Sequence, residues 1–165
     1  MTQPPTVLVV DDQIGEVLWL IRDLQGRGYH VVHATNERTA RQRLLAVSLG
    51  QESYRLAIVD IAVAIMDIED MVRERVNFDA RFLEDSAVAG LRLCEYARNE
   101  LKLSKRELPI VCLSIRARDK DVETRLTPLG IEVFERDSQG PEQSIRRYLD
   151  QHLPPLKPDQ TSRKA

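Results

Sequence analysis

Cysteine and long apolar runs are both scarce in this 165-residue chain, and each scarcity excludes a class of protein. The two cysteines, Cys94 and Cys112, are too few for a disulfide scaffold and are typical of a reducing compartment. No apolar run approaches the roughly 20 residues that span a bilayer, and the first residues lack the pattern of a secretory signal. We therefore expect a cytoplasmic protein that does not contact membranes.

An excess of charge of one sign is also missing. Lys and Arg number 24 and Asp and Glu number 26, for a net charge of −2, so no basic field would attract nucleic acid. Aromatic residues make up only 5% of the chain, but 42% is hydrophobic and 30% is charged, which is typical of a globular protein. The length is that of about one domain. We expect no direct binding of nucleic acid.

Five short β-rich runs alternate with stretches of helical period. The runs cover residues 6–11, 30–33, 54–60, 109–114 and 131–135. The first, third and fourth are apolar on both faces, as strands covered by helices on both sides are. Apolar spacing predicts helices over about 14–24, 37–47, 91–101, 119–129 and 140–149, with Asn36 as the N-cap of the second. This alternation predicts a three-layer α/β domain with a parallel sheet.

Two segments do not fit the alternation. Residues 61–86 separate the third strand from its helix, although such loops usually take about 2–6 residues. This insertion is acidic and has no Gly or Pro, and its apolar residues at near-helical spacing predict a short amphipathic helix: Ile65, Ile68, Met71, Val72 and Val76. The other segment, residues 153–165, has three prolines and predicts a disordered or surface-laid tail after a domain of residues 1–152.

Acidic residues follow two of the predicted strands. Asp11 and Asp12 come after the first strand and Asp60 ends the third, while the fourth ends in Ser114. In a doubly wound sheet the ligand site lies beyond the carboxyl ends of the strands. Each aspartate alone could equally cap a helix or solvate a strand end. Together they favour a site in which Mg²⁺ offsets the repulsion between carboxylates and a carboxylate attacks phosphorus.

Five motifs in order carry a resemblance to a known family. They are VLVVDD at 7–12, LAIVD at 56–60, AGLRLCEYAR at 89–98, LPIVCLS at 108–114 and LGIEVFERD at 129–137. Over about residues 6–150 the chain resembles the receiver domain of two-component response regulators. The resemblance implies a flavodoxin-like, doubly wound sheet of five parallel strands in the order 2-1-3-4-5, flanked by five helices.

The resemblance also implies a role for each site residue. Asp60 would accept a phosphoryl group from a histidine kinase or a histidine phosphotransfer protein. Asp11, Asp12 and Asp60, with the backbone carbonyl of Ala62, would hold Mg²⁺. The hydroxyl of Ser114 would close onto the phosphoryl group.

The fifth-strand motif departs from the family. A lysine followed by proline is usual there, whereas this chain has Arg136 and then Asp137. We interpret Arg136 as the replacement cation, although a shifted register would put Asp137 in its place. The planar guanidinium is not equivalent to an ammonium, so the exchange is not neutral. Phe134 matches the aromatic residue that repacks when the hydroxyl moves, and Ile115 stands where a small residue is usual.

These features predict a stand-alone phosphorylatable switch that is not itself an enzyme. After Phe134 the sequence has room only for a last helix and the tail, so output would pass to an unidentified downstream protein. The family's usual output face includes Arg118, Lys120, Phe134, Arg146 and Tyr148. The insertion could be a lid, a gate, a homodimer face or a tolerated elaboration.

Two alternatives remain open at this point. The first is a degenerate receiver that binds partners without being phosphorylated, which the lost Lys-Pro pair and the insertion suggest. The second is a Mg²⁺-dependent phosphohydrolase with Asp60 as nucleophile. It is disfavoured because the second aspartate of haloacid-dehalogenase-like phosphatases is missing after Asp60.

Overall fold

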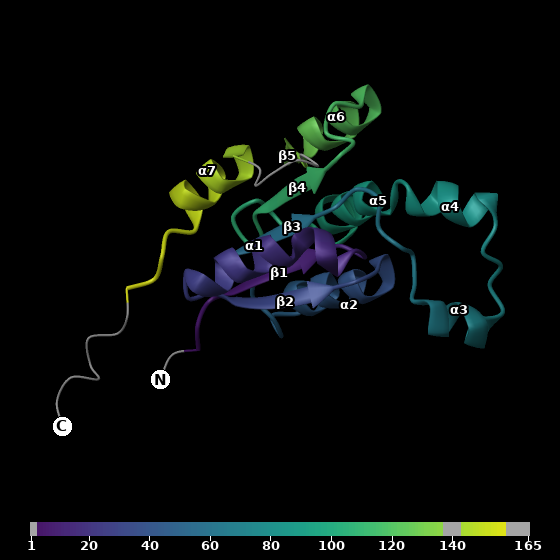
Figure 1. The fold of residues 1–165 in the computed structure, drawn as a ribbon, viewed down its shortest axis with the longest axis horizontal. Helices are drawn as coiled ribbons and strands as arrows, with labels where there is room; N and C mark the ends of the chain where they lie inside the picture. Colours follow the sequence, from purple (N-terminus) through teal and green to yellow (C-terminus); the bar gives the residue numbers. More distant parts are fainter. Residues whose placement is uncertain (1–2, 137–142, 158–165) are drawn as a thin grey trace.

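The computed structural model of the chain describes residues 3–136 and 143–157. Its five strands form one parallel sheet in the order β2-β1-β3-β4-β5, which confirms the predicted order (Figure 1). The strands are β1 (Thr6–Val10), β2 (His30–Ala34), β3 (Leu56–Val59), β4 (Ile110–Ser114) and β5 (Glu132–Glu135). Each begins or ends within two residues of its predicted bounds.

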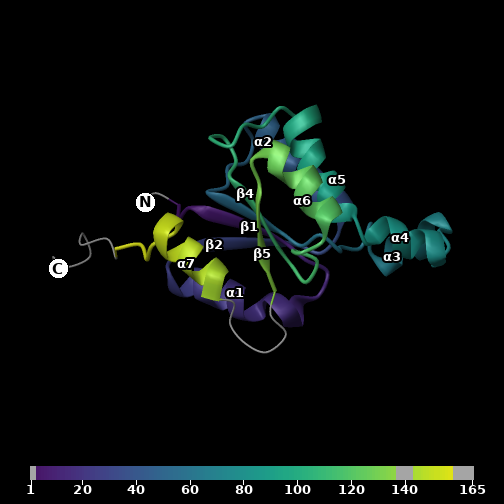
Figure 2. The same ribbon diagram turned by 90° about the horizontal axis from the view of Figure 1, so that it is seen from above.

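Helices cover both faces of the sheet (Figure 2). On one face lie α1 (Ile14–Gly26) and α7 (Gln143–His152). On the other lie α2 (Glu37–Ser48), α5 (Ala89–Glu95) and α6 (Lys120–Leu126). A π-helical turn, Tyr96–Glu100, continues α5, and a 3₁₀ turn, Thr127–Leu129, follows α6. The three layers agree with the prediction.

Side chains of the central strands alternate between two cores, as the period of a strand requires. Val7 and Val9 pack toward α1 and α7, whereas Leu8 and Val10 pack toward α2 and α5. This is why the runs of β1, β3 and β4 are apolar throughout: each is covered on both faces. The free cysteines Cys94 and Cys112 are both buried in the second core, as small hydrophobic residues.

The predicted helices exist, but their buried sides differ in part. In α1, Val17, Leu20 and Leu24 line the core, whereas Ile14 is 58% exposed. Asn36 caps α2 as predicted, because its Oδ1 accepts the backbone N–H of Thr39 at 2.8 Å. The predicted start of the last helix, residues 140–141, lies outside the described residues, and α7 is described from Gln143.

The insertion folds as two short helices in place of the single predicted one. They are α3 (Ile68–Glu74) and α4 (Ala80–Ser86), and they extend from the carboxyl edge of the sheet (Figure 1). The prediction that Ile68, Met71 and Val72 share one buried apolar face is wrong in part. Met71 is buried, whereas Ile68 and Val72 are exposed. Spacing alone cannot say which side of a helix a neighbouring layer will cover.

After α7, Leu153 is buried in the core, and the chain then lies along the surface as far as the structure describes it. Leu156 donates its backbone N–H to the carbonyl of Arg27 at 2.8 Å, and the hydroxyl of Tyr29 donates to the carbonyl of Pro154 at 3.0 Å. The surface-laid alternative agrees with the exposed residues 154–157 but not with the buried Leu153, and residues 158–165 lie outside the described part. Among the described helices none has the length and apolar character needed to cross a bilayer.

Candidate functional site

The candidate site lies where the neighbouring strands β1, β3, β4 and β5 end at one edge of the sheet. The ladder continues one residue past the strands, because Asp60 N–H donates to the carbonyl of Val10 at 2.9 Å and Arg136 N–H donates to that of Ser114 at 3.0 Å. Asp11, Asp60 and Ser114 are 1%, 8% and 0% exposed. The backbone of the sheet therefore places three buried polar side chains and Arg136 side by side.

Arg136 bridges the two buried aspartates. Its Nη2 forms an ion pair with Asp11 Oδ2, and its Nη1 lies 3.6 Å from Asp60 Oδ2. The side chain of Arg136 is only 9% exposed, so these charges interact away from bulk water. Arg136 is thus the cation that the structure brings to the site, and Asp137 lies outside the described residues.

Backbone donors orient the remaining carboxylate oxygens. Asp11 Oδ1 accepts the N–H of Gln13 at 2.8 Å, and Asp60 Oδ1 accepts the N–H of Ile61 at 2.7 Å. Each carboxylate therefore keeps one oxygen directed at the space it shares with Arg136. Such local hydrogen bonds hold the side chains in one orientation without any ligand.

Burial dominates the electrostatics of Asp60. It raises the pKa of this carboxyl to about 6, with a further increase from the nearby charge of Asp11. The positive charge of Arg136 and a hydrogen bond with Ser114 lower the pKa, but not enough to offset burial. At neutral pH most molecules consequently carry an ionised Asp60, the form that can act as a nucleophile.

Asp12 lies at the rim of the site and connects it to the insertion. Its side chain is exposed as a whole, yet its Oδ2 accepts the backbone N–H of Ala64 at 3.1 Å. Desolvation of the carboxylate raises the pKa of Asp12, the hydrogen bond from Ala64 lowers it, and the charge of Asp11 raises it further. Ala62, half-buried, lies on the chain between Asp60 and this contact.

Gly90 packs directly against the backbone of Asp60, a contact that the sequence analysis did not predict. A Cβ at this position would lie 2.0 Å from the backbone oxygen of Asp60 and 2.7 Å from the Cα of Ile61, so only glycine fits. The Gly90 N–H also donates to the carbonyl of Ile61 at 2.9 Å. The one available signal was a glycine within a helical pattern, which often marks a close approach of backbones.

Arg116 was also missed, and it connects the Ser114 loop to the other end of the insertion. Its backbone N–H donates to Ser114 Oγ at 3.3 Å, and its Nη1 donates to the carbonyl of Ala87 at 2.7 Å. An ion pair with Asp119 at 2.7 Å fixes the guanidinium. Nothing in the local sequence distinguishes Arg116 from a surface arginine, because the partner that ties it to the insertion, Ala87, lies 29 residues away along the chain.

The aromatic residue and the bulky residue next to the site lie apart from its centre. Phe134 is half-buried against Tyr148, with ring centroids 5.3 Å apart. Ile115 is 71% exposed, so its side chain is directed to solvent and leaves room beside Ser114. On the expected output face, Arg146 lies over the ring of Trp19 on α1, 5.3 Å from its centroid.

The chemistry of the donors fits magnesium. Asp11, Asp12 and Asp60 offer only oxygen atoms, which Mg²⁺ prefers, and three carboxylates beside the single guanidinium of Arg136 leave an excess of negative charge. In the described ranges no three or more acidic, histidine or cysteine side chains are already arranged to hold a metal ion. Arg136 is the group that now contacts both buried carboxylates.

No protein-family model matches the sequence, and no curated protein matches it either. The structure is similar to a response regulator from Burkholderia pseudomallei solved with a phosphorylated aspartic acid, with 19% identity and a TM-score of 0.54 over 86% of this chain. The chain spans 64% of the length of that protein.

Two further solved structures cover the chain more completely. The chemotaxis response regulator CheY4 of Vibrio cholerae has 18% identity and a TM-score of 0.58, over 91% of this chain and 99% of that one. The response regulator TrrA of Thermotoga maritima, solved in complex with Mg²⁺ and BeF, has 18% identity and a TM-score of 0.56, over 90% of this chain and 99% of that one. The chain thus has the fold of response-regulator receiver domains.

Proposed function

We propose that this chain is a phosphorelay receiver in which Asp60 accepts a phosphoryl group from a histidine kinase or a histidine phosphotransfer protein. The observation that carries the proposal is the position of Asp60, buried at the carboxyl edge of a receiver fold between Arg136 and Ser114. The chain would act in the cytoplasm as a switch rather than as an enzyme. Its output would pass through contacts with a downstream protein.

The chemistry is a transfer between two proteins. A carboxylate oxygen of Asp60 attacks phosphorus, the new P–O bond forms as the P–N bond to the donor's imidazole breaks, and the electron pair stays on the imidazole nitrogen. Arg136 neutralises charge on the transferred group, and the hydroxyl of Ser114 donates a hydrogen bond to it. Mg²⁺ held by Asp11, Asp12, Asp60 and the Ala62 carbonyl would supply further charge neutralisation.

Intact mass after incubation with acetyl phosphate and Mg²⁺ tests the proposal. We expect one phosphoryl group on the wild-type chain, none on Asp60→Asn, and one on Asp121→Asn, a control at an exposed aspartate of α6. A label that persists in Asp60→Asn would contradict the proposal. Continuous turnover of a small phosphoester would instead indicate the phosphohydrolase.

A degenerate receiver is the second candidate, and the ion pair between Arg136 and Asp11 favours it. In that case the guanidinium of Arg136 permanently neutralises the carboxylate of Asp11, which a receiver would use to bind Mg²⁺. The chain would then stay unlabelled both with acetyl phosphate and with a phosphorylated histidine phosphotransfer protein, although it is folded. Labelling by either donor excludes this candidate.

A further inference from the structure

A cavity of about 550 Å³ lies between the insertion and the rim of the candidate site. Met71 and Phe82, which are 6% and 8% exposed, are its buried apolar side chains, whereas Ile68 and Phe78 stand at its open side. Asp12 belongs to its lining and so joins it to the site. This volume is within the range of pockets that bind small molecules, about 300–1,000 Å³.

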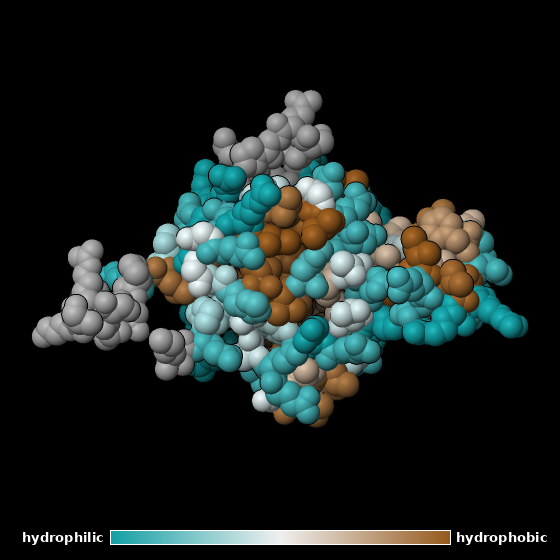
Figure 3. All heavy atoms as spheres, turned by 60° about the horizontal axis from the view of Figure 1, so that its bottom comes forward, coloured by the Kyte–Doolittle hydropathy of each residue, from teal (hydrophilic) through white to brown (hydrophobic). Residues whose placement is uncertain are grey.

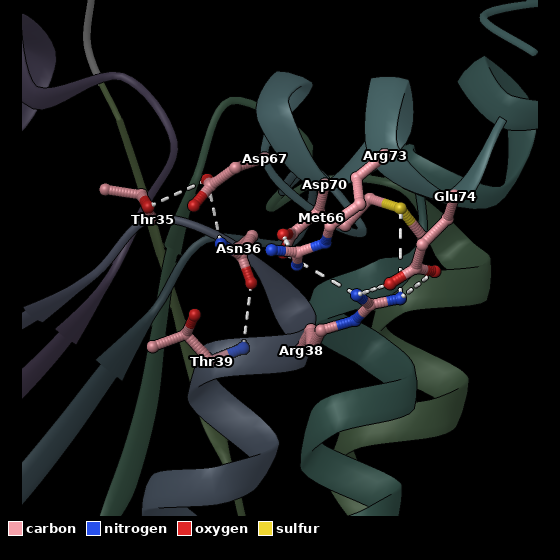
Figure 4. A network of polar contacts seen from close by, with 9 residues as sticks. All are labelled: Thr35, Asn36, Arg38, Thr39, Met66, Asp67, Asp70, Arg73 and Glu74. Carbon is pink, nitrogen blue, oxygen red and sulfur yellow. Dashed lines mark hydrogen bonds and ion pairs between the residues drawn. The ribbon is translucent and has the colours of Figure 1, made fainter. Parts of the chain in front are cut away.

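Polar contacts hold the insertion against the start of α2, so the cavity does not depend on a ligand for its shape (Figure 4). Asn36 Nδ2 donates to Asp67 Oδ1 at 2.8 Å, while its Oδ1 caps α2. Arg38 donates to both carboxylate oxygens of Glu74, at 2.6 and 2.9 Å. A bidentate pair and a capped helix start restrict the insertion to one position.

Backbone hydrogen bonds reinforce this attachment. The first N–H groups of α2, which no helical carbonyl can satisfy, donate to the insertion: Glu37 N–H to the carbonyl of Ala64 at 2.8 Å and Arg38 N–H to that of Ile65 at 3.1 Å. At its base, Val63 N–H donates to the carbonyl of Ser86 at 3.2 Å, which joins the two ends of the insertion. The insertion is therefore an anchored part of the fold.

The solvent-exposed side of the insertion carries several large apolar side chains, although exposed positions are usually polar. Ile68, Val72, Phe78 and Leu83 are 78%, 74%, 69% and 53% exposed. In Figure 3 brown and tan side chains gather on the projecting part at the right, bordered by hydrophilic ones. Apolar side chains grouped in this way on one projection mark an interaction site more often than scattered ones do.

The charge of this region restricts what it can bind. The acidic side chains that line the cavity are those of Asp12, Asp67 and Glu69, and no basic side chain of the described residues lines it. The insertion carries seven acidic residues against three arginines: Asp67, Glu69, Asp70, Glu74, Asp79, Glu84 and Asp85 against Arg73, Arg75 and Arg81. Its field is therefore negative beside its apolar patch.

We infer that this cavity and the apolar side of the insertion dock a segment of a partner protein that presents an apolar side chain next to lysine or arginine. Charge complementarity supports this occupant. A second copy of the chain would bring the same negative field to the contact, and nucleic acid or an anionic membrane would be repelled. The inference does not rest on phosphoryl transfer, since it needs only the insertion and its charges.

The test uses the full chain and two synthetic probe peptides. One has leucine and phenylalanine on one helical face and lysine on the other, and the matched peptide has glutamate in place of lysine. We expect the lysine peptide to shift the backbone NMR signals of Ile68, Phe78 and Phe82, and the glutamate peptide to shift none of them. Binding should weaken with added salt.

Surface variants locate the contact. Phe78→Ser and Ile68→Ser should each weaken binding of the lysine peptide roughly fivefold to tenfold, because each removes an apolar contact without disturbing the core. Leu49→Ser, at a leucine that is 61% exposed after α2, is the matched control and should bind as the wild type does. Glu69→Lys should weaken binding more than Glu123→Lys on α6.

Three results would overturn the inference. The shifts could fall on another face, Phe78→Ser and Ile68→Ser could bind like Leu49→Ser, or the chain could form a dimer in sedimentation that Ile68→Ser abolishes. The last result would assign the surface to a second copy. Absence of phosphoryl labelling on the wild-type chain, or a label that persists in Asp60→Asn, would change none of these measurements, so the inference and the proposed function fail separately.

Discussion

Two clusters of arginine and carboxylates occur in this molecule, one buried and one at the surface. In the buried cluster Arg136 contacts Asp11 and Asp60, with exposed side-chain fractions of 9%, 1% and 9%. In the surface cluster Arg38 contacts Glu74 and Asp70 from α3. Both clusters consist of one arginine and two carboxylates. Ala64, at the start of the insertion, forms backbone hydrogen bonds both to Asp12 at the candidate site and to Glu37 at the start of α2.

The same chemistry has opposite electrostatic results in the two places. Burial raises the pKa of Asp60 to about 6 in spite of Arg136, whereas the hydrogen bond from Arg38 lowers the pKa of Glu74. Water solvates the carboxylates of the surface cluster, so the arginine there has only a small desolvation cost to offset. Burial, rather than the number of opposite charges, thus decides whether a carboxylate here is held in its ionised form.

The largest effect is expected from a change that leaves every charge in place. Gly90→Ala puts a methyl group 2.0 Å from the backbone oxygen of Asp60, and we expect a loss of about 3 kcal/mol in the free energy of unfolding, the upper end of the usual cost of overpacking. Gly15→Ala, where the added carbon meets nothing within 4 Å, should instead be slightly stabilising in α1. Urea unfolding measures both, and equal effects would contradict the role given to Gly90.

Asp60→Asn should stabilise the chain in a manner that depends on pH. The folded pKa of about 6 exceeds the usual value of about 3.9, so below pH 4 both states hold the proton and above pH 6 both are ionised. The wild type therefore loses stability as pH rises from about 4 to 7, by at most about 3 kcal/mol, and the variant does not. Urea unfolding across this range, without divalent ions, measures the difference.

Glu74→Gln is the matched control in the surface cluster, and its sign is opposite. The folded pKa of Glu74 is lowered, so its ionised form stabilises the fold above the unfolded pKa and that contribution disappears as pH falls. The variant should be slightly less stable than the wild type at neutral pH and equal to it in acid. If both substitutions show the same pH dependence of stability, the opposite pKa shifts of Asp60 and Glu74 are contradicted.

The last effect concerns the affinity for the metal. Arg136→Gln removes the guanidinium from Asp11 and Asp60, and we expect Mg²⁺ to bind about tenfold more tightly, which is about 1.4 kcal/mol. Arg38→Gln should leave the affinity unchanged, because its partners lie in the surface cluster. Calorimetric titration with Mg²⁺ decides this, and unchanged or weaker binding to Arg136→Gln would refute competition between the two cations.

The order of elements could be predicted from the sequence, because local patterns carry that information. Apolar runs bounded by turns located the strands, and the cap at Asn36 located the start of α2. Asp11, Asp60 and Ser114 could be placed together because parallel strands end at one edge of a sheet. That Arg136 reaches this edge was predicted only as one of two registers.

What could not be predicted depends on contacts between distant segments. The close approach of Gly90 to Asp60 and the bond from Arg116 to Ala87 involve partners that no local pattern identifies. Ile68 is exposed because no neighbouring segment covers it, which local spacing cannot indicate either. The roles proposed for the site residues stay predictions until phosphorylation is measured.

The sequence by itself determined the alternation of strands and helices, the acidic strand ends and the negative charge of the insertion. These follow from side-chain chemistry and spacing along the chain. Only the tertiary structure decided which carboxylates share Arg136 and how far burial raises the pKa of Asp60. It also decided that the insertion is anchored to α2, next to a cavity that is lined by both apolar and acidic side chains, among them Asp12. The reason is that desolvation and ion pairing depend on distances in space, which packing alone sets.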